Sequence, residues 1–597
     1  MTSPTELPIY SIRNALLEAA HTIRRFVVVA PTGSGKSTQV PQMMCDGGLS
    51  GQIVILQPRR LAARLLAARV AHERGVALGD EVGYQVRFEG AASERTRILY
   101  VTEGVLLRRL MSDPELDGVG AVLFDEFHER HLYGDVTLAR VRQLQLTRRP
   151  DLCLGVMSAT LEAEPVAAWM SPCATLRAEG RIYPVDIEYL PRALDRDLPI
   201  WEAAARAVES AVSSAPEGHT LIFMPGAYEI ARTLDALRNS PAARGCALLP
   251  LHGDLPPAAQ DEAVTPSTRP KIIVATNVAE TSLTIEGVRT VIDSGLARIP
   301  RYDPRRGINT LYVEPISRAA ADQRAGRAGR TGPGRCLRLW TEREHRTRPA
   351  VEIPEIRRLE LSEIVLALKA CGVEDLASFP WFEPPPAEAL ARAEGLLRDL
   401  GATDARGALT PLGRRMAEFP LHPRYARMLI EADRRHAIRQ VALFAALTQG
   451  RDLLRRGSDP RVRERREIHL GDAASDFFIL ARAWSYAKRC RFDPASCERL
   501  GIHALAGRQV EPVYQLFLRC AERAGLTLEG PPPTDEDLCK CLLAGFADHV
   551  ARRLDGGTLR CAMTHGRRGR LDRNSVVQDA PLLVAAEVTE IGGRDVE

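Results

Sequence analysis

Three short segments of the chain carry side chains suited to phosphate chemistry. They read APTGSGKS at residues 30–37, DEFH at 125–128 and QRAGRAGR at 323–330. The first has the composition of a loop that cradles a triphosphate, the second sets two carboxylates beside a bound metal, and the third supplies arginines that reach a γ-phosphate. In this order they predict an ATPase divided between two domains, in which hydrolysis drives relative domain motion.

The glycine-rich segment has the features of a phosphate loop. Gly33 and Gly35 let backbone N–H groups face the phosphates, and a helix N-terminus after them adds positive potential. Lys36 would reach the β- and γ-phosphates, and the Ser37 hydroxyl would bind Mg²⁺. Ala30 stands where the usual pattern has its first glycine. A chance lysine in an ordinary turn is the alternative, which the apolar run before the loop disfavours. The expected ATP contacts are Thr32, Gly33, Ser34, Gly35, Lys36, Ser37 and Thr38.

The DEFH segment follows an apolar run, so its carboxylates are expected at the carboxyl edge of a sheet, where open α/β folds bind ligands. Asp125 would hold Mg²⁺ through water. Glu126, also beside the metal, would orient and deprotonate the attacking water. His128 alone would more often be structural, but its place after two functional carboxylates favours a catalytic role.

The third segment holds Arg324, Arg327 and Arg330 after Gln323. A solvated basic face is the usual explanation of such a run. The spacing and the glutamine favour function, because guanidinium groups stabilise the charge that spreads over the oxygens in phosphoryl transfer. Arginines supplied by another domain would make catalysis depend on domain closure.

The organisation of the chain predicts an α/β fold followed by helices. At 597 residues we expect four or five domains. Apolar runs alternating with helical stretches such as Leu61–Arg74 predict parallel sheets. We read Tyr183–Pro199 as a connector between two such domains. The predicted strands are Phe26–Ala30, Ile53–Leu56, Ile98–Val101, Ala121–Phe124 and Leu154–Met157, and then Leu221–Phe223, Ile272–Ala275, Val288–Ile292 and Cys336–Leu339.

The last third of the chain has a different pattern. We expect helices over Glu355–Gly372 and Ala387–Gly401, long helices from Pro411 to about Arg523, and a linker at Gly530–Pro533. Short β-rich segments are expected after Leu538. They are Thr558–Met563, Ser575–Gln578 and Leu582–Val588.

Composition narrows the function classes. Net charge is only +4, so any nucleic-acid surface must be local. Twelve scattered cysteines suggest reduced thiols and a cytoplasmic protein, and Cys539 and Cys541 lack the second pair that a zinc site needs. We find neither an apolar run of membrane-spanning length nor a signal peptide.

With these motifs the chain resembles the DEAH-box helicases of superfamily 2, and within them the bacterial HrpB-type group. The match runs from about Leu7 to the C-terminus. Further segments carry it: LQPRRLAA at 56–63, TEG at 102–104, SAT at 158–160, LIFM at 221–224 and ATNVAETSLTI at 275–285. Phe127 replaces the alanine of the group's name, but both carboxylates and the histidine are present.

The resemblance implies roles for single residues. Gln323, Arg327 and Arg330 would act on the γ-phosphate, and Ser282 would lie near it. Ser158 and Thr160 would couple hydrolysis to strand separation. The residues implied to hold nucleic acid are Arg59, Arg60, Thr102, Gly104 and Thr281. Arg59 and Arg60 also follow a predicted strand, at a junction where backbone phosphates can dock.

The resemblance also implies two tandem RecA-like P-loop domains, at 1–180 and 181–350. A winged helix (351–415), a helical ratchet bundle (416–530) and an OB-like fold (531–597) would follow. Relatives continue past this C-terminus, so we expect the OB-like fold to be shortened. Many relatives also place an aromatic side chain near Val264 to stack on the nucleobase. The aliphatic residue here predicts weak base selection, with ATP and other nucleoside triphosphates accepted.

The function implied is an ATP- and Mg²⁺-dependent enzyme that moves 3′→5′ along single-stranded RNA and opens duplexes, acting as a monomer. A DNA helicase or translocase remains open, since no motif reads the 2′-hydroxyl. An RNA-binding clamp that does not unwind processively also remains open. Arms at Ala297–Tyr302 and Ile308–Val313 predict a hairpin, either a buttress of the second domain or a wedge facing the incoming duplex.

Overall fold

The computed structural model describes residues 7–159, 163–180, 183–213, 218–280, 285–455, 459–588, 590–591 and 595–596. Thr160, Thr281 and Ser282 lie outside these residues. The chain forms two compact units. Unit 1 comprises Met1–Pro300, Leu311–Leu359 and Phe379–Pro384, and unit 2 comprises Arg301–Thr310, Glu360–Ser378 and Pro385–Glu597. In the part of the chain that is described, no helix combines the length and apolarity needed to cross a membrane.

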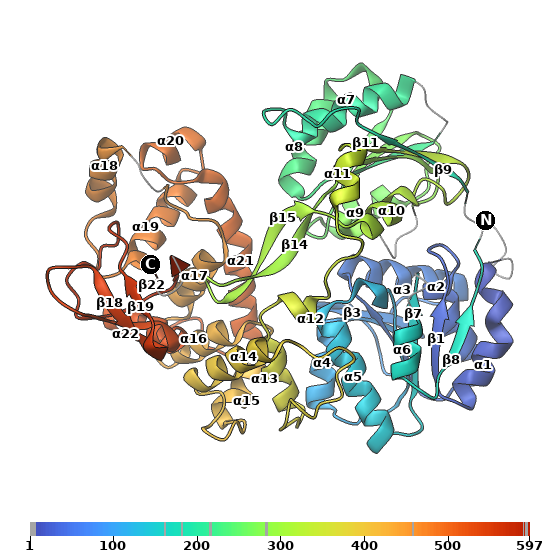
Figure 1. The fold of residues 1–597 in the computed structure, drawn as a ribbon, viewed down its shortest axis with the longest axis horizontal. Coiled ribbons are helices and arrows are strands. Elements are labelled where there is room, and N and C mark those ends of the chain that lie inside the picture. The colour runs from blue at the N-terminus through green and yellow to red at the C-terminus, as the bar shows by residue number, and fades with distance from the viewer. Residues whose placement is uncertain are drawn as a thin grey trace. The chain divides into compact units, whose positions relative to one another are not determined.

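The first half of unit 1 is an eight-stranded sheet of order β4-β3-β5-β2-β6-β7-β1-β8, drawn in blue and cyan in Figure 1. All neighbouring strands are parallel except β3 and β4. The strands are β1 (Arg25–Val29), β2 (Gln52–Gln57), β3 (Val82–Val86), β4 (Glu89–Ala91), β5 (Ile98–Thr102), β6 (Val119–Phe124), β7 (Cys153–Ser158) and β8 (Ala174–Arg177). The helices are α1 (Arg13–His21), α2 (Lys36–Asp46), α3 (Arg60–Arg74), α4 (Glu103–Ser112), α5 (Leu132–Thr147) and α6 (Glu164–Trp169).

The five strands predicted for this half are confirmed, because each is an apolar run buried in the sheet. In β1, Phe26 to Val29 are all buried, as expected for a parallel strand covered on both faces. Strands β5, β2, β6, β7 and β1 are consecutive neighbours. Their carboxyl ends therefore bring Thr102, Gln57, Asp125, Ser158 and the phosphate loop to one edge of the sheet.

The second half of unit 1 repeats this architecture with a parallel six-stranded sheet of order β11-β12-β10-β13-β16-β9. Its strands are β9 (Val185–Tyr189), β10 (His219–Phe223), β11 (Ala247–Leu251), β12 (Lys271–Ala275), β13 (Val288–Asp293) and β16 (Gly334–Arg338). Its helices are α7 (Ile200–Ser213), α8 (Ala227–Arg238), α9 (Pro257–Val264), α10 (Arg318–Ala325) and α11 (Glu342–Thr347), and the short α12 (Glu355–Arg358) follows.

The prediction of a mere connector at Tyr183–Pro199 is wrong, because this segment contains β9. Strand β9 pairs in parallel with β16 at the edge of the sheet. Its central residues Asp186 to Glu188 are exposed, so it lacks the continuous apolar run of a buried strand. The two arms of the expected hairpin are confirmed as β14 (Leu296–Asp303) and β15 (Ile308–Pro315), which form a two-stranded sheet.

Unit 2 is mainly helical and ends in a small sheet. Its helices are α13 (Ser362–Ala370), α14 (Ala387–Asp399), α15 (Pro411–Ala417), α16 (Pro423–Asp433), α17 (Ile438–Gln449), α18 (Pro460–Leu470), α19 (Asp476–Arg489), α20 (Pro494–Arg499), α21 (Ala504–Arg523) and α22 (Asp535–Gly545). The sheet has the order β20-β17-β18-β19-β22-β21. Its strands are β17 (Val550–Arg553), β18 (Arg560–Met563), β19 (Arg568–Arg570), β20 (Leu582–Val584), β21 (Glu590–Ile591) and β22 (Asp595–Val596).

Two predictions for this region are corrected. The single helix expected over Glu355–Gly372 is broken between α12 and α13, where Leu359 has an extended backbone. The β-rich segment expected at Ser575–Gln578 forms no strand. Instead the Ser575 hydroxyl and the Val576 N–H donate to the Asp476 carboxylate at 2.7 and 2.9 Å. A side chain on α19 thus takes the place of a neighbouring strand.

Candidate active site

The phosphate loop lies between β1 and α2. Gly33 and Gly35 have φ values of +88° and +93°, a left-handed conformation that glycine adopts without strain. Nothing lies within 4 Å of the position that a Cβ on Gly33 would occupy. Gly35 precedes the first residue of α2, so the free N–H groups of this helix point toward the loop.

The residues of the loop fit a bound triphosphate. Lys36 is buried at 3% exposure beside the acidic segment. Within the described residues, the hydroxyl of Ser34, 2% exposed, has no hydrogen-bond partner. Thr38 donates from its hydroxyl to the Gly35 carbonyl at 3.3 Å, which steadies the first turn of α2. A buried ammonium, an orphaned hydroxyl and an open glycine cradle together suit the β- and γ-phosphates.

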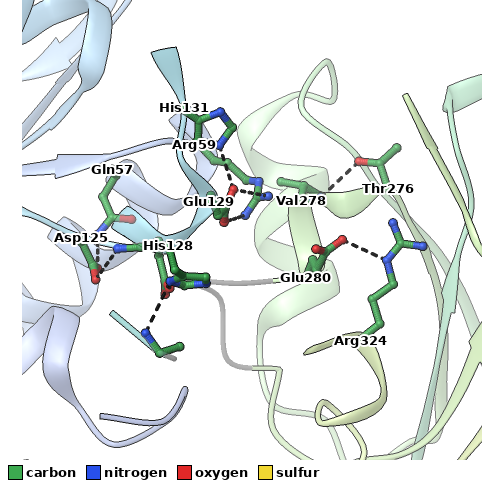
Figure 2. A network of polar contacts seen from close by, with 12 residues as sticks. Gln57, Arg59, Asp125, His128, Glu129, His131, Thr276, Val278, Glu280 and Arg324 are labelled. Atoms are coloured by element: carbon green, nitrogen blue, oxygen red, sulfur yellow. Dashed lines mark hydrogen bonds and ion pairs between the residues drawn. The ribbon is translucent and has the colours of Figure 1, made fainter. Parts of the chain in front are cut away.

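The acidic segment contacts the phosphate loop through Lys36. Figure 2 shows Asp125 with Gln57 in this segment's surroundings. Lys36 Nζ is 3.3 Å from Glu126 Oε1. The Gln57 side-chain amide donates to Asp125 Oδ2 at 2.5 Å, and the Glu126 N–H donates to Asp125 Oδ1 at 2.9 Å. Asp125 and Glu126 are 5% and 2% exposed. The structure therefore brings together Lys36, Asp125 and Glu126 as the motifs predicted.

The two carboxylates have opposite electrostatic environments. Burial, followed by the charge of Glu126, raises the pKa of Asp125 to about 6, although Lys36 and hydrogen bonds from Ser37 and Gln57 oppose this. Burial alone would raise the pKa of Glu126 too, but Lys36 and His128 outweigh it and the pKa is lowered. Ser37 and Asp125 thus supply adjacent oxygens of the kind that Mg²⁺ prefers, so the residues fit this metal.

His128 connects the acidic segment to the end of β7. Its Nδ1 accepts from the Ala159 N–H at 3.4 Å and lies 3.6 Å from Glu126 Oε2. Burial lowers the pKa of His128, which favours the neutral ring that this accepting role requires. Ser158 is buried at the end of the same strand. The predicted coupling segment is thereby in contact with the predicted catalytic segment.

The arginines of the third motif follow α10. Gln323 lies within this helix. Arg327 is 4% exposed, and its guanidinium Nε donates to the Glu280 carbonyl at 2.8 Å. Burial and the nearby charge of Arg330 lower the pKa of Arg327, while burial lowers that of Arg330 to about 10 against the opposing charge of Glu126. Both guanidinium groups are desolvated and interact electrostatically with Glu126. Such groups are suited to binding a γ-phosphate.

Arg324 is the member of this motif to which sequence reasoning assigned no role. Its guanidinium donates to Glu280 Oε2 at 2.9 Å and to Asp293 Oδ1 at 2.8 Å, and it lies over the Phe223 ring at 4.8 Å. Arg324 is 1% exposed. It therefore anchors the Glu280 side chain while Arg327 holds the Glu280 carbonyl, and Figure 2 shows the first of these contacts.

The predicted nucleic-acid residues separate into two groups. Arg60 at the start of α3 is exposed, with a loose ion pair to Glu89 at 3.7 Å. Thr102 precedes α4, and a Cβ on Gly104 in its first turn would meet open space. Arg59 differs, because its side chain is only 16% exposed and its guanidinium pairs with Glu129. Val264, at the end of α9, packs partly buried against the core and offers no stacking face.

The cysteines form neither disulfides nor a metal-binding cluster among the described residues. All twelve cysteines lie among the described residues, and none forms a disulfide. No group of three or more histidine, cysteine or acidic residues suited to a metal occurs in the part of the chain that the structure describes. Cys539 and Cys541 on α22 are therefore not part of such a cluster.

Comparisons with known proteins agree with this geometry. Three family profiles match: DEAD/DEAH box helicase over residues 10–168, Helicase conserved C-terminal domain over 203–332, and Helicase associated domain (HA2), winged-helix, over 393–421. The chain is similar to the crystal structure of Escherichia coli DEAH/RHA helicase HrpB, with 32% identity, coverage of 98% of this chain and 69% of that one, and a TM-score of 0.73. A structure of E. coli DExH-box NTPase HrpB gives 33% identity, coverage of 100% and 68%, and a TM-score of 0.70.

Proposed function

The chain belongs to the DEAH/RHA helicase family, as the HrpB structures show, and is therefore a nucleic-acid-dependent NTPase. From this premise we propose that it hydrolyses ATP, and other nucleoside triphosphates, to move 3′→5′ along single-stranded RNA and to open duplexes. RNA as the substrate and the direction of movement rest on the resemblance to DEAH-box RNA helicases. One observation supports the translocase part: His128 of the catalytic segment is hydrogen-bonded to Ala159 of the predicted coupling segment.

The proposed reaction assigns each side chain one task. Lys36 and the loop N–H groups bind the β- and γ-phosphates. Glu126 orients the attacking water and accepts its proton, for which a lowered pKa keeps the carboxylate ionised at neutral pH. Gln323, Arg327 and Arg330 stabilise the charge that develops on the γ-phosphate oxygens. Mg²⁺, when held by Ser37 and Asp125 with Glu126 beside it, neutralises phosphate charge.

The nucleic-acid track is proposed to run along the carboxyl edge of the first sheet. Arg60 is exposed there, and the N-terminus of α4 at Thr102 and Gly104 has free N–H groups and open space for a phosphate. Thr281 would contact the backbone from the second domain, while Ser158, Thr160 and Ser282 would couple the two sites. Arg59 would reach a phosphate after leaving Glu129.

We also propose the domain division at 1–180, 181–350, 351–415, 416–530 and 531–597, which corresponds to two RecA-like domains, winged helix, ratchet bundle and OB-like fold. Two observations support it: a parallel sheet in each of the first two segments, and a run of helices before the last sheet. We also propose a monomer in the cytoplasm; the twelve cysteines, none of which forms a disulfide, suit a reducing compartment.

The decisive experiment measures ATPase rates with single-stranded RNA, with single-stranded DNA and with neither, followed by unwinding of duplexes tailed at the 3′ or the 5′ end. We expect RNA to stimulate most and only the 3′-tailed RNA duplex to open. Equal or greater stimulation by DNA would favour a DNA helicase or translocase. RNA stimulation without any unwinding would favour the RNA-binding clamp.

A further inference from the structure

Glu129, directly after His128, holds Arg59 by two hydrogen bonds. Arg59 Nη1 donates to Glu129 Oε1 and Nη2 donates to Oε2, each at 2.8 Å. The two side chains are 16% and 11% exposed. Since Arg59 follows β2 and Glu129 follows β6, this pair joins the predicted nucleic-acid segment to the catalytic segment at the edge of the sheet.

His131 holds the same carboxylate from a second direction. Its Nε2 is 2.8 Å from Glu129 Oε2, and its Nδ1 is 3.3 Å from Glu355 Oε1. Burial would lower the pKa of His131, but Glu355 and Glu129 raise it well above its usual value, so both ring nitrogens carry protons. Glu355 also accepts from the Leu132 N–H at 2.9 Å. Figure 2 shows Arg59 and His131 converging on Glu129.

The backbone between Glu129 and Glu126 is a single tight turn. Residues Phe127–Glu129 form a 3₁₀ turn that Glu126 and Arg130, both with φ of 51°, flank in the left-handed conformation. Non-glycine residues adopt this conformation at a cost, and they do so mainly where the surroundings hold them. The Glu129 N–H donates to the Glu126 carbonyl at 3.0 Å. A displacement of Glu129 therefore passes directly to His128 and Glu126.

We propose that Glu129 and His131 are positioning residues through which nucleic acid stimulates hydrolysis, with the Arg59–Glu129 pair as the exchangeable contact. This inference rests on the proposed nucleic-acid-stimulated ATPase. A phosphodiester offers a guanidinium two oxygens in nearly the arrangement that a carboxylate does. When Arg59 turns to a backbone phosphate, Glu129 keeps its contact with His131 but loses Arg59, the 127–129 turn shifts, and Glu126 moves into its working position.

The test compares ATP hydrolysis by the full chain with and without a homopolymeric single-stranded RNA, in wild type and in Glu129→Gln. The amide keeps the shape of the side chain but holds Arg59 far more weakly. Arg59 then loses the carboxylate that competes with RNA for it, so the half-saturating RNA concentration should fall about threefold or more. The ratio of stimulated to unstimulated rate should fall about fivefold or more, since the contact that RNA normally breaks is already loose.

A matched control makes the same change at the neighbouring ion pair. Glu89→Gln removes the partner of Arg60, but that pair is loose at 3.7 Å and its side chains are 57% and 42% exposed. It should leave both RNA readouts at wild-type values. If Glu129→Gln does not fold, Glu129→Asp carries the test, because the shorter side chain keeps the charge but cannot hold both guanidinium nitrogens. Its ratio should fall about twofold or more.

The outcomes separate the inference from the proposed function. Wild-type ATPase that responds to neither RNA nor DNA would overturn the proposed function. If wild type responds, a folded Glu129→Gln variant in which either the half-saturating concentration or the ratio stays at its wild-type value overturns the inference, and so does a Glu129→Asp variant whose ratio stays there. An equal loss of rate with and without RNA has the same meaning, because the ratio is then unchanged and the pair only supports the fold.

Discussion

Lys36, Asp125 and Glu126 show how a buried site distributes charge among neighbouring residues. One ammonium serves two carboxylates, and it lowers the pKa of Glu126 while Asp125 is left with a raised pKa. The ionised form of Glu126 is thus favoured, which suits the base proposed above, and Asp125 is the more easily protonated of the two carboxylates. The three side chains are all almost fully buried, so water cannot compensate for the loss of any of these charges.

Glu126→Gln should keep ATP bound but stop its hydrolysis. The amide retains the shape of the side chain and cannot accept a proton, so turnover should fall by about 10² or more while nucleotide affinity changes little. Lys36→Ala should instead weaken binding itself, because it removes the cation of the phosphate loop. Nucleotide binding and single-turnover hydrolysis, measured on both variants, check this. Turnover near wild type in Glu126→Gln would contradict the assignment of the base.

Arg330→Ala should lower kcat by about 10² or more and raise KM for ATP much less, because a trans-acting arginine works mainly in the transition state. Arg318→Ala is the matched control, since Arg318 is an exposed arginine at the start of α10. Steady-state kinetics at saturating RNA compare the two variants. A kcat within about twofold of wild type in Arg330→Ala would make this arginine structural.

Glu103 gives a pH dependence with a definite sign. Burial, reinforced by Glu355, Glu129 and Asp135 against His131, raises the pKa of Glu103 from 4.5 to about 7. Between these values the folded protein binds more protons than the unfolded chain, so this group costs stability as pH rises, and the full cost is present above about pH 7.

Glu103→Gln removes this cost, so it should stabilise unit 1 at pH 8 by on the order of 1–2 kcal/mol and do nothing comparable near pH 4.5. The shift in thermal unfolding relative to wild type, followed across this pH range, measures the effect. Glu94→Gln, at an exposed position, serves as the control. A difference that is independent of pH would show that Glu103 is not the titrating group.

At the scale of elements, the hairpin of β14 and β15 is more constrained than its sequence indicates. Its tip belongs to unit 2, where Arg306 Nε donates to Glu587 Oε1 at 2.8 Å and the Val588 N–H donates to the Arg305 carbonyl at 2.7 Å. Asp303 is buried at 4% exposure. The turn that composition alone would place in solvent is thus held by polar contacts within unit 2.

Arg306→Ala should release the hairpin tip. We expect RNA-stimulated ATPase to stay within about twofold of wild type while duplex unwinding falls about fivefold or more, because translocation would continue without a fixed strand-separating element. Arg305→Ala is the control, since its side chain is 46% exposed against 14% for Arg306. Both rates are measured on one tailed duplex at one salt concentration, because phosphate contacts are salt-dependent. A parallel loss of both activities would favour the buttress.

For the whole molecule, a buried ion pair between Arg424 and Asp548 connects distant parts of unit 2. Arg424 on α16 is 1% exposed and donates to Asp548 Oδ1 and Oδ2 at 2.6 and 3.0 Å, as well as to the Gly545 carbonyl at 2.6 Å. It also lies 4.7 Å from the Phe546 ring. The pair lowers the pKa of Asp548 to about 2 despite burial, and it joins the helices to the segment that leads into the last sheet.

Arg424→Ala should destabilise unit 2 by about 3–5 kcal/mol, because it leaves Asp548 buried without its cation. Thermal unfolding should show an earlier transition for unit 2 while nucleotide binding by unit 1 is retained. Arg434→Ala, at a side chain that is 76% exposed, should shift unfolding by less than about 1 kcal/mol. Loss of nucleotide binding together with the early transition would show that the two units unfold as one.

The motifs predict an ATPase site from the sequence alone, and the apolar runs predict most of the buried strands. The phosphate loop, DEFH and the arginine motif are each a short continuous segment, so their functions can be predicted from residue type and spacing. Strands such as β1 are continuous apolar runs because both faces of a parallel sheet are covered. The edge strand β9 was not predicted, because its middle residues are exposed and it therefore has no continuous apolar run. The same reasoning failed at Ser575–Gln578, where Asp476, a distant residue, binds the backbone.

The ion pairs between residues far apart in the sequence are known only from the tertiary structure. The sequence predicts that Arg59 contacts a backbone phosphate, whereas in the structure it pairs with Glu129, which lies 70 residues along the chain. Arg306, in the turn between the two predicted hairpin arms, likewise pairs with Glu587. Local patterns report how a residue favours its own helix or strand, whereas an ion pair depends on two loops meeting in space. Burial then strengthens the attraction between the two charges, because less water screens them.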